Sequence, residues 1–295
     1  MKAGRKLLAV ILALVVGALT AGCGGSEQPK ELTLANIGWD ENVAVSTLTK
    51  VLLEDELGYE RVERQSAALD STYQAVATGE IGAFQDVWLP NQRDLLSSVE
   101  DDVEQLSYSY QGQTEQGLAV PSYMNTTSLN QLNDSEADLI LGIEPGSVVM
   151  GVVYDEVMPT YRLKQKLVEA STEGMLAEVE RLYNDREEFA LVAWSPHWMN
   201  QRYDLRYLED PNDAFGELND PARITTIVNK NLPENEPAAY AFMNALIFNE
   251  DQLNDLESTI EEMGDPLEGA RQWAQDNRDV WQPWVEAAEN ATQES

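Results

Sequence analysis

The stretch LTLANIGWDENVAVSTLTKVLLEDELG, residues 32–58, contains the pattern on which the predicted fold depends. Its first residues predict a short β-strand over Leu32–Ile37, which ends at Gly38 and Trp39. Apolar residues then recur at helical spacing and predict a helix over Val43–Leu57, with Gly58 as its C-terminal cap.

The segment that follows repeats this order of strand and helix. Val62–Gln65 predicts a second strand, and Ser71–Thr78 predicts a short helix that Gly79 ends. Ile81–Val87 predicts a third strand, which leads directly to Trp88. Strands that alternate with helices in this way predict an α/β fold with a parallel sheet.

Tryptophans follow the carboxyl ends of the predicted strands, where ligands of parallel α/β sheets bind. Trp39 and Trp88 stand at two such ends, and Trp194 follows a strand predicted over Phe189–Ala193. A single buried tryptophan is more often part of a core. Three that converge would suit a cation without N–H donors, because the face of an indole attracts a quaternary ammonium group.

The length of 295 residues exceeds one typical hydrophobic core and predicts two lobes. We expect residues 32–118 and 225–295 to form lobe 1, and residues 119–224 to form lobe 2. Gly117–Pro121 is the expected crossover, and the chain is expected to return near Ile224–Val228. The second lobe is predicted to contain a strand over Leu139–Ile143 and a helix from about Val149. Helices are predicted from Pro237 to Ala288.

Residues 1–22 have the features of an export signal. Basic residues precede the apolar run Leu7–Val16, which is short for a membrane span. Leu19–Cys23 then forms a lipobox, so Cys23 is the expected site of lipidation, with residues 23–31 as a polar tether. The alternative is an uncleaved signal anchor with an incidental cysteine. We therefore expect an extracytoplasmic protein that a lipid anchors to the cell membrane.

The formal net charge of −33 excludes some classes of partner. So acidic a surface repels nucleic acid and anionic lipid headgroups. The charge indicates either simple solubility or adaptation to a salty medium that screens self-repulsion. With one histidine and one cysteine, the chain has too few ligands for a typical zinc site. No metal and no cofactor are expected.

Several ordered motifs of this chain together resemble one protein family. They are Trp39–Glu41, Ala77–Ile81, Trp88–Asn91, Gly142–Ser147, Trp194–Trp198 and Tyr203–Pro211. From about Leu32 to Trp284 the chain resembles the substrate-binding proteins of ABC-type glycine betaine/proline betaine importers. The resemblance implies a type II periplasmic-binding fold, in which two α/β lobes on a hinge close over the ligand.

The resemblance also implies the residues of the site. In this family a three-sided aromatic cage surrounds the trimethylammonium group, and the matching residues here are Trp39, Trp88 and Trp194. The ligand carboxylate is held partly by backbone amides at a helix start, here those of Val148 and Val149. Val148 stands where the family's turn more often has glycine. Arg93 stands where the family usually has histidine, and it either holds the carboxylate or points to solvent and pairs with Asp94.

Other residues near these motifs have less specific interpretations. Asp40, Glu41 and Asp86 flank the predicted cage, either as solvated loop acids or caps, or as groups that complement a cation or accept the hydroxyl of choline. His197 is expected to be structural, and Trp198 is expected to pack between helix and sheet. The remaining tryptophans are expected to be core or surface packing of a lobe: Trp273, Trp281 and Trp284.

The sequence thus predicts a monomeric capture protein without catalytic residues, which delivers a quaternary ammonium solute to an ABC permease and ATPase. Glycine betaine or proline betaine is preferred to choline, because Arg93 and the amides after Ser147 suit an anion. The alternatives are a choline- or carnitine-type binding protein and a ligand-sensing lipoprotein. An exported glycosidase that pairs Asp40 with Asp86 is a further alternative.

Overall fold

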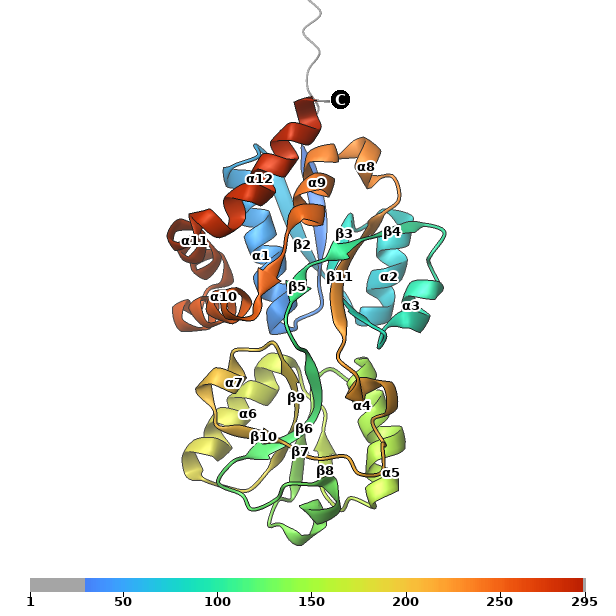
Figure 1. Ribbon diagram of the computed structural model, residues 1–295, viewed down its shortest axis with the longest axis vertical. Coiled ribbons are helices and arrows are strands. Elements are labelled where there is room, and N and C mark those ends of the chain that lie inside the picture. The colour runs from blue at the N-terminus through green and yellow to red at the C-terminus, as the bar shows by residue number, and fades with distance from the viewer. Residues whose placement is uncertain (1–29, 294–295) are drawn as a thin grey trace, which may run out of the picture.

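The structure is a computed structural model that describes residues 30–293, and the chain forms two lobes stacked along its long axis (Figure 1). The predicted signal peptide, Cys23 and the tether as far as residue 29 lie outside the described residues. Glu31, which was expected to belong to that tether, is instead the first residue of strand β1.

The sheet of lobe 1 has the strand order β2-β1-β3-β11-β4, with bounds Arg61–Ser66, Glu31–Asn36, Ala83–Leu89, Arg223–Asn229 and Val103–Tyr108. β1 lies parallel to β2 and β3, as the alternation of strands and helices predicted. β11 is antiparallel to both of its neighbours. The helices of this lobe are α1 (Asp40–Asp55), α2 (Leu69–Thr78), α3 (Arg93–Ser97), α8 (Leu232–Asn235), α9 (Pro237–Ala245), α10 (Glu250–Met263), α11 (Pro266–Asp276) and α12 (Arg278–Gln293).

The sheet of lobe 2 has the order β10-β6-β9-β7-β8, with bounds Leu205–Tyr207, Glu115–Pro121, Ala190–Ser195, Leu139–Leu141 and Lys166–Val168. Its helices are α4 (Val148–Val152), α5 (Met158–Tyr161), α6 (Thr172–Asp185) and α7 (Met199–Arg202), with a π-helical turn over Val153–Val157 between α4 and α5. Short 3₁₀ helices span Leu129–Asp134 and Gly216–Asn219.

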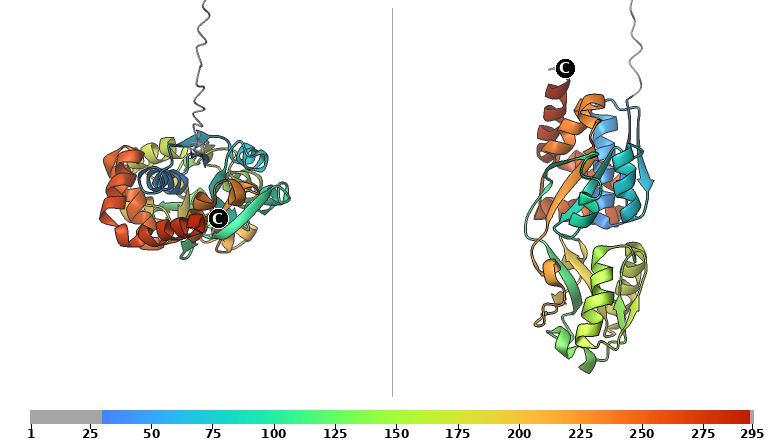
Figure 2. Two further views of the ribbon diagram at one scale, coloured as in Figure 1. Left: turned by 90° about the horizontal axis from the view of Figure 1, so that it is seen from above. Right: turned by 90° about the vertical axis from the view of Figure 1, so that its right-hand side faces the viewer.

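The first crossing between the lobes differs from the prediction, whereas the chain returns to the sheet of lobe 1 in β11, which begins at Arg223, close to the predicted place. β5 (Tyr110–Gln111) pairs with β12 (Phe248–Asn249) beside lobe 1, whereas β6 belongs entirely to the sheet of lobe 2. The first crossing therefore falls between Gln111 and Glu115, ahead of the predicted boundary at 118 and 119. The two connections run along the same side of the molecule (Figure 2), where Thr114 Oγ1 donates to the carbonyl of Ala222 at 3.1 Å.

Element ends differ from the prediction by a few residues. Gly79 ends α2 in the left-handed conformation, as predicted. The cap of α1 is instead Glu56, and Gly58 takes its left-handed φ of 70° in the turn beyond it. β3 and β9 extend further than expected, so that Trp88 and Trp194 are strand residues and do not follow the strands.

The central strands β3, β9 and β11 are buried along almost their whole length, as is typical of sheets covered by helices. β3 is buried at every position except Leu89, and α1 is almost completely buried between the sheet and α10 and α11. Within residues 30–293, no helix combines the length and apolar character needed to cross a bilayer.

Candidate ligand-binding site

A cleft lies between the lobes, where the ends of their strands face each other. Its walls are formed by Trp39, Glu41, Trp88, Asn91, Gln92, Gln116, Ile143, Ser147, Val148, Val149, Val192, Ala193 and Trp194. Both lobes contribute to the walls, so a ligand here would contact each of them.

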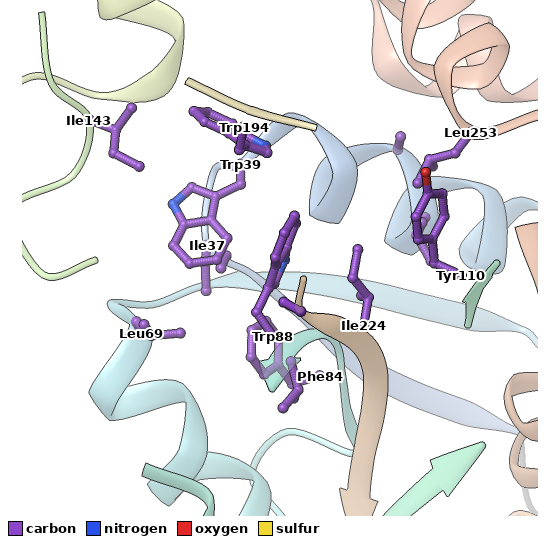
Figure 3. Packing of buried hydrophobic residues seen from close by; sticks show 14 of the residues in the cluster. Ile37, Trp39, Leu69, Phe84, Trp88, Tyr110, Ile143, Trp194, Ile224 and Leu253 are labelled. Carbon is purple, nitrogen blue, oxygen red and sulfur yellow. The ribbon is translucent and has the colours of Figure 1, made fainter. Parts of the chain in front are cut away.

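The three tryptophans predicted to form the cage all line this cleft. Trp39 precedes α1 as its N-cap, Trp88 lies near the carboxyl end of β3, and Trp194 lies near the carboxyl end of β9. Figure 3 shows their indoles close together, with Ile143 on the other side of Trp39. Gly38 permits the sharp turn before Trp39, because its φ of 89° is unfavourable for other residues.

Buried carboxyl groups fix the orientation of two of these indoles. Trp88 Nε1 donates to Asp86 Oδ1 at 2.7 Å, and Trp194 Nε1 donates across the lobes to Glu41 Oε2 at 3.1 Å. Asp86 and Glu41 are only 1% and 3% exposed. Both indole N–H groups are therefore satisfied by protein acceptors at the ring edges.

Burial makes it unfavourable for these acids to carry charge. Burial raises the pKa of Asp86 from its ordinary value of 3.8 to about 8, although the bond from Trp88 opposes the shift. The pKa of Glu41 is raised well above its ordinary value, by burial and then by the charges of Asp86 and Glu257. A cation in the cleft would offset part of this cost, because opposite charge favours the ionised carboxylate.

Replacing Asp86 with asparagine is expected to increase stability at alkaline pH. The folded pKa of about 8 exceeds the ordinary value of 3.8, so folding takes up a proton and stability falls as pH rises between these two values. Asparagine retains an oxygen for the Trp88 N–H and removes the charge. We expect a gain of roughly 1–3 kcal/mol at about pH 8 and a smaller gain at about pH 5. Denaturant titrations at both pH values measure this, and an equal gain at both would contradict it.

The turn before α4 presents free backbone donors to the cleft. Ser147 is the N-cap, and the first bond of the helix runs from the Gly151 N–H to the Ser147 carbonyl at 3.3 Å. The N–H groups of Val148 and Val149 therefore have no acceptor within the helix. Val148 adopts ordinary helical angles, so the site does not require the glycine that the family more often has there. Ser147 Oγ is buried and has no partner among the described residues.

Arg93 lies outside the cleft, so of its two predicted placements the structure has the solvent-facing one, with Glu217 as partner in place of Asp94. Its side chain is 62% exposed and its Nη1 lies 3.6 Å from Glu217 Oε1, on the 3₁₀ helix of lobe 2. Asn91 and Gln92 reach the cleft in its place. The physical reason is the turn after β3: Gln92 is directed inward to accept a 2.7 Å bond from the Tyr73 hydroxyl, and Arg93 begins α3 on the outside.

The wall residues that the prediction missed are Asn91, Gln92, Gln116, Ile143, Val192 and Ala193. Most of them lie in or next to a predicted site motif, and this position in the sequence could have indicated that they line the cleft. Gln116 lies next to no predicted site motif. It lies in β6 and accepts a 2.6 Å bond from Asn91 Nδ2 of the other lobe, a contact that depends entirely on how the lobes meet.

Trp198 does not pack between helix and sheet as expected. Its indole N–H donates across the lobes to Asp40, and its side chain lines a second crevice beside the cage. His197 is fully buried and accepts the N–H of Met199 through Nδ1, a structural role in its turn. The C-terminal tryptophans are core residues of lobe 1, as predicted: Trp273, Trp281 and Trp284. Among residues 30–293, no three His, Cys, Asp or Glu side chains are grouped to hold a metal ion.

One curated relative is similar to this chain over part of its length. The glycine betaine/carnitine transport binding protein GbuC of Listeria monocytogenes serotype 1/2a (strain 10403S) is 28% identical over 153 residues, which cover 51% of this chain and 50% of that protein. The chain thus aligns with about half the length of this curated relative.

Solved structures match the whole two-lobed fold. Lactococcal OpuAC, in its closed-liganded conformation with glycine betaine, has a TM-score of 0.76 and 28% identity, covering 87% of this chain and 99% of the other. An ABC-transporter choline binding protein in an unliganded semi-closed conformation has a TM-score of 0.73 and 26% identity, covering 86% and 91%. The family described as the substrate-binding domain of the ABC-type glycine betaine transport system matches residues 30–276, and this chain therefore belongs to that family.

Proposed function

We propose that the protein captures glycine betaine, or a close quaternary ammonium relative, in a cage formed by Trp39, Trp88 and Trp194. The observation that carries the proposal is that three indoles, two from lobe 1 and one from lobe 2, line a single cleft. Each cation–π contact contributes roughly 0.5–2 kcal/mol once water is excluded. Three such contacts with a hydrogen-bonded carboxylate approach the roughly 8 kcal/mol of a micromolar site.

The carboxylate of the ligand would bind at the start of α4. The free N–H groups of Val148 and Val149 and the unpartnered Ser147 hydroxyl are the donors that support this placement. Arg93 has no part in the proposed site, because it is exposed and paired with Glu217.

Choline is a second candidate, which Glu41 supports. This buried carboxyl group lines the cleft beside Trp194, and no lysine or arginine occurs among the described wall residues. A carboxylate complements a cation and can accept a hydroxyl hydrogen bond, whereas it repels the carboxylate of a betaine. The two ligands thus differ in which end of the cleft they use.

Competition calorimetry decides between the two ligands. We expect glycine betaine to bind more tightly than choline, because the donors at Val148 and Val149 have a charged acceptor only in betaine. The titration should include proline betaine, carnitine and trimethylamine oxide. Tighter binding of choline would assign the site to choline, with Glu41 as the hydroxyl acceptor. Binding of none of these compounds would reject the proposed function.

The same proposal includes delivery of the ligand to an ABC permease and its ATPase. The protein would act as a monomer outside the cytoplasm, anchored to the membrane by a lipid on Cys23. A sensor that presents its ligand-bound state to a receptor would use the same cleft. An enzymatic role has less support, because Asp86 lies behind Trp88 and Asp40 faces the second crevice, so neither of the acids weighed for a glycosidase lines the cage. We therefore propose a protein without chemistry of its own.

A further inference from the structure

A second set of contacts joins the lobes beside the cage. Trp198 precedes α7 in lobe 2 and is 5% exposed. Its backbone N–H donates to Glu257 Oε2 of α10 at 2.9 Å, and its indole N–H donates to Asp40 at the start of α1. One residue of lobe 2 therefore satisfies two carboxyl groups of lobe 1 at once. In Figure 1, α7 faces α10 across the junction of the lobes.

Two further groups of lobe 2 lie near acids of lobe 1. Arg202 Nη1 lies 3.3 Å from Glu261 Oε1 of α10. His197 Nε2 lies 3.4 Å from Asp40 Oδ2 but has no hydrogen-bond partner among residues 30–293. The Arg202 guanidinium also lies over the Trp198 ring, at 5.5 Å from its centroid. Lobe 2 thus supplies donors and lobe 1 supplies acceptors, a complementary arrangement across the junction.

These contacts exist only while the lobes are together. Glu257 is 2% exposed, and its pKa is raised well above its ordinary value, by burial and then by the charge of Asp40. Its Oε1 has no partner among the described residues, so the bond from the Trp198 N–H is the compensation that the structure gives it for burial. Separating the lobes would break both bonds of Trp198.

Trp198 does not line the cage. We propose that Trp198, Asp40 and Glu257 form an interlobe latch, in which Trp198 is a positioning residue that stabilises the closed protein whatever ligand the cage holds. The proposal rests on the proposed function, because it assigns the latch to the trapping of a ligand in that cleft.

Loss of the latch has a signature that loss of a cage residue does not have. A contact that stabilises only the closed state multiplies the apparent affinity for every ligand by the same factor. A cage residue contacts the ligand itself, so its removal changes the ranking of ligands. A uniform loss of affinity therefore distinguishes a latch from a direct contact.

The test compares Trp198→Phe with the matched control Trp273→Phe. Both remove an indole N–H bonded to a carboxylate, but Trp273 donates to Asp255 at 2.8 Å within lobe 1. We expect Trp198→Phe to weaken glycine betaine and choline by the same factor, roughly 3- to 30-fold, mainly through faster dissociation. Trp273→Phe should bind as the parent does. Calorimetry and stopped-flow fluorescence measure affinity and dissociation.

A double-mutant cycle between Trp198 and Asp40 tests the hydrogen bond between them without relying on a single variant. Asp40→Ala removes the acceptor from the other lobe, so combining it with Trp198→Phe should cost less than the two single effects together. Additive effects would contradict the bond between them. The latch proposal would be overturned if Trp198→Phe bound both ligands with parental affinity, or if it lost affinity for only one of them.

The latch and the proposed function can fail separately. If the parent binds neither glycine betaine nor choline, the proposed function fails. The latch is then judged from the ligand-free radius of gyration in solution scattering, which should be larger for Trp198→Phe than for the parent and Trp273→Phe. Equal radii of the three proteins in that case would overturn the latch as well.

Discussion

Replacing Trp88 with alanine is expected to weaken the binding of glycine betaine and of choline by roughly 5- to 150-fold. The substitution removes one wall of the cage with its cation–π contact and its packing against the ligand, which together contribute about 1–3 kcal/mol. Trp88 is 1% exposed and lines the cleft, so no other side chain can take its place without rearrangement. Calorimetry at low temperature measures the loss in the folded protein.

Two controls separate this loss from general damage. Trp88→Phe should cost less than Trp88→Ala, because a smaller π-face remains. Trp273→Ala removes an indole of the same burial, 1% exposed in lobe 1, and both alanine variants create a core cavity that lowers stability by about 3–5 kcal/mol. Only Trp88→Ala should lose affinity. The reverse result, in which Trp273→Ala loses affinity and Trp88→Ala keeps it, would mean that the ligand does not bind beside Trp88.

Local sequence patterns were sufficient to predict the strands that carry the cage. β1 and β3 are short apolar runs bounded by glycine and followed by turns, and such signals depend only on neighbouring residues. The carboxyl-end rule for parallel strands then placed Trp39 and Trp88 at one edge of the sheet. The extension of β3 through Trp88 did not alter that placement.

The direction of Arg93 could not be predicted in the same way. Its position relative to Trp88 left both the ligand carboxylate and solvent open, and the turn between them directs Gln92 to Tyr73 and leaves Arg93 beside Glu217. These partners come from α2 and from lobe 2, so the choice depends on tertiary contacts that the local sequence does not contain.

Trp198 illustrates a similar limit. Trp198 stands four residues after Trp194 and was expected to pack between helix and sheet, but its partners Asp40 and Glu257 belong to the other lobe. The first crossing between lobes was also misplaced, because the pairing of β6 with β9 joins residues far apart in the chain. Contacts between lobes are the features that sequence reasoning missed most.

Replacing Val148 with proline is expected to weaken glycine betaine roughly 10- to 100-fold and to leave choline nearly unchanged. Proline removes the backbone N–H, and a hydrogen bond to a charged group is worth about 1.5–3 kcal/mol. The fold should tolerate the change because Val148 is the first residue of α4, where proline is favoured. Ser147, with φ −72° and ψ 146°, already has the extended conformation that a residue before proline requires.

Val148→Ala is the matched control, since it shortens the same side chain and keeps the N–H. Calorimetry with both ligands should show that alanine retains the affinity for glycine betaine and that proline loses it. Equal weakening by alanine and proline would mean that the side chain, which also lines the cleft, makes the contact. Parental affinity of Val148→Pro for glycine betaine would place the carboxylate elsewhere in the cleft. Equal loss of choline would mean that the substitution disturbs the cage, because choline has no carboxylate for this N–H to bind.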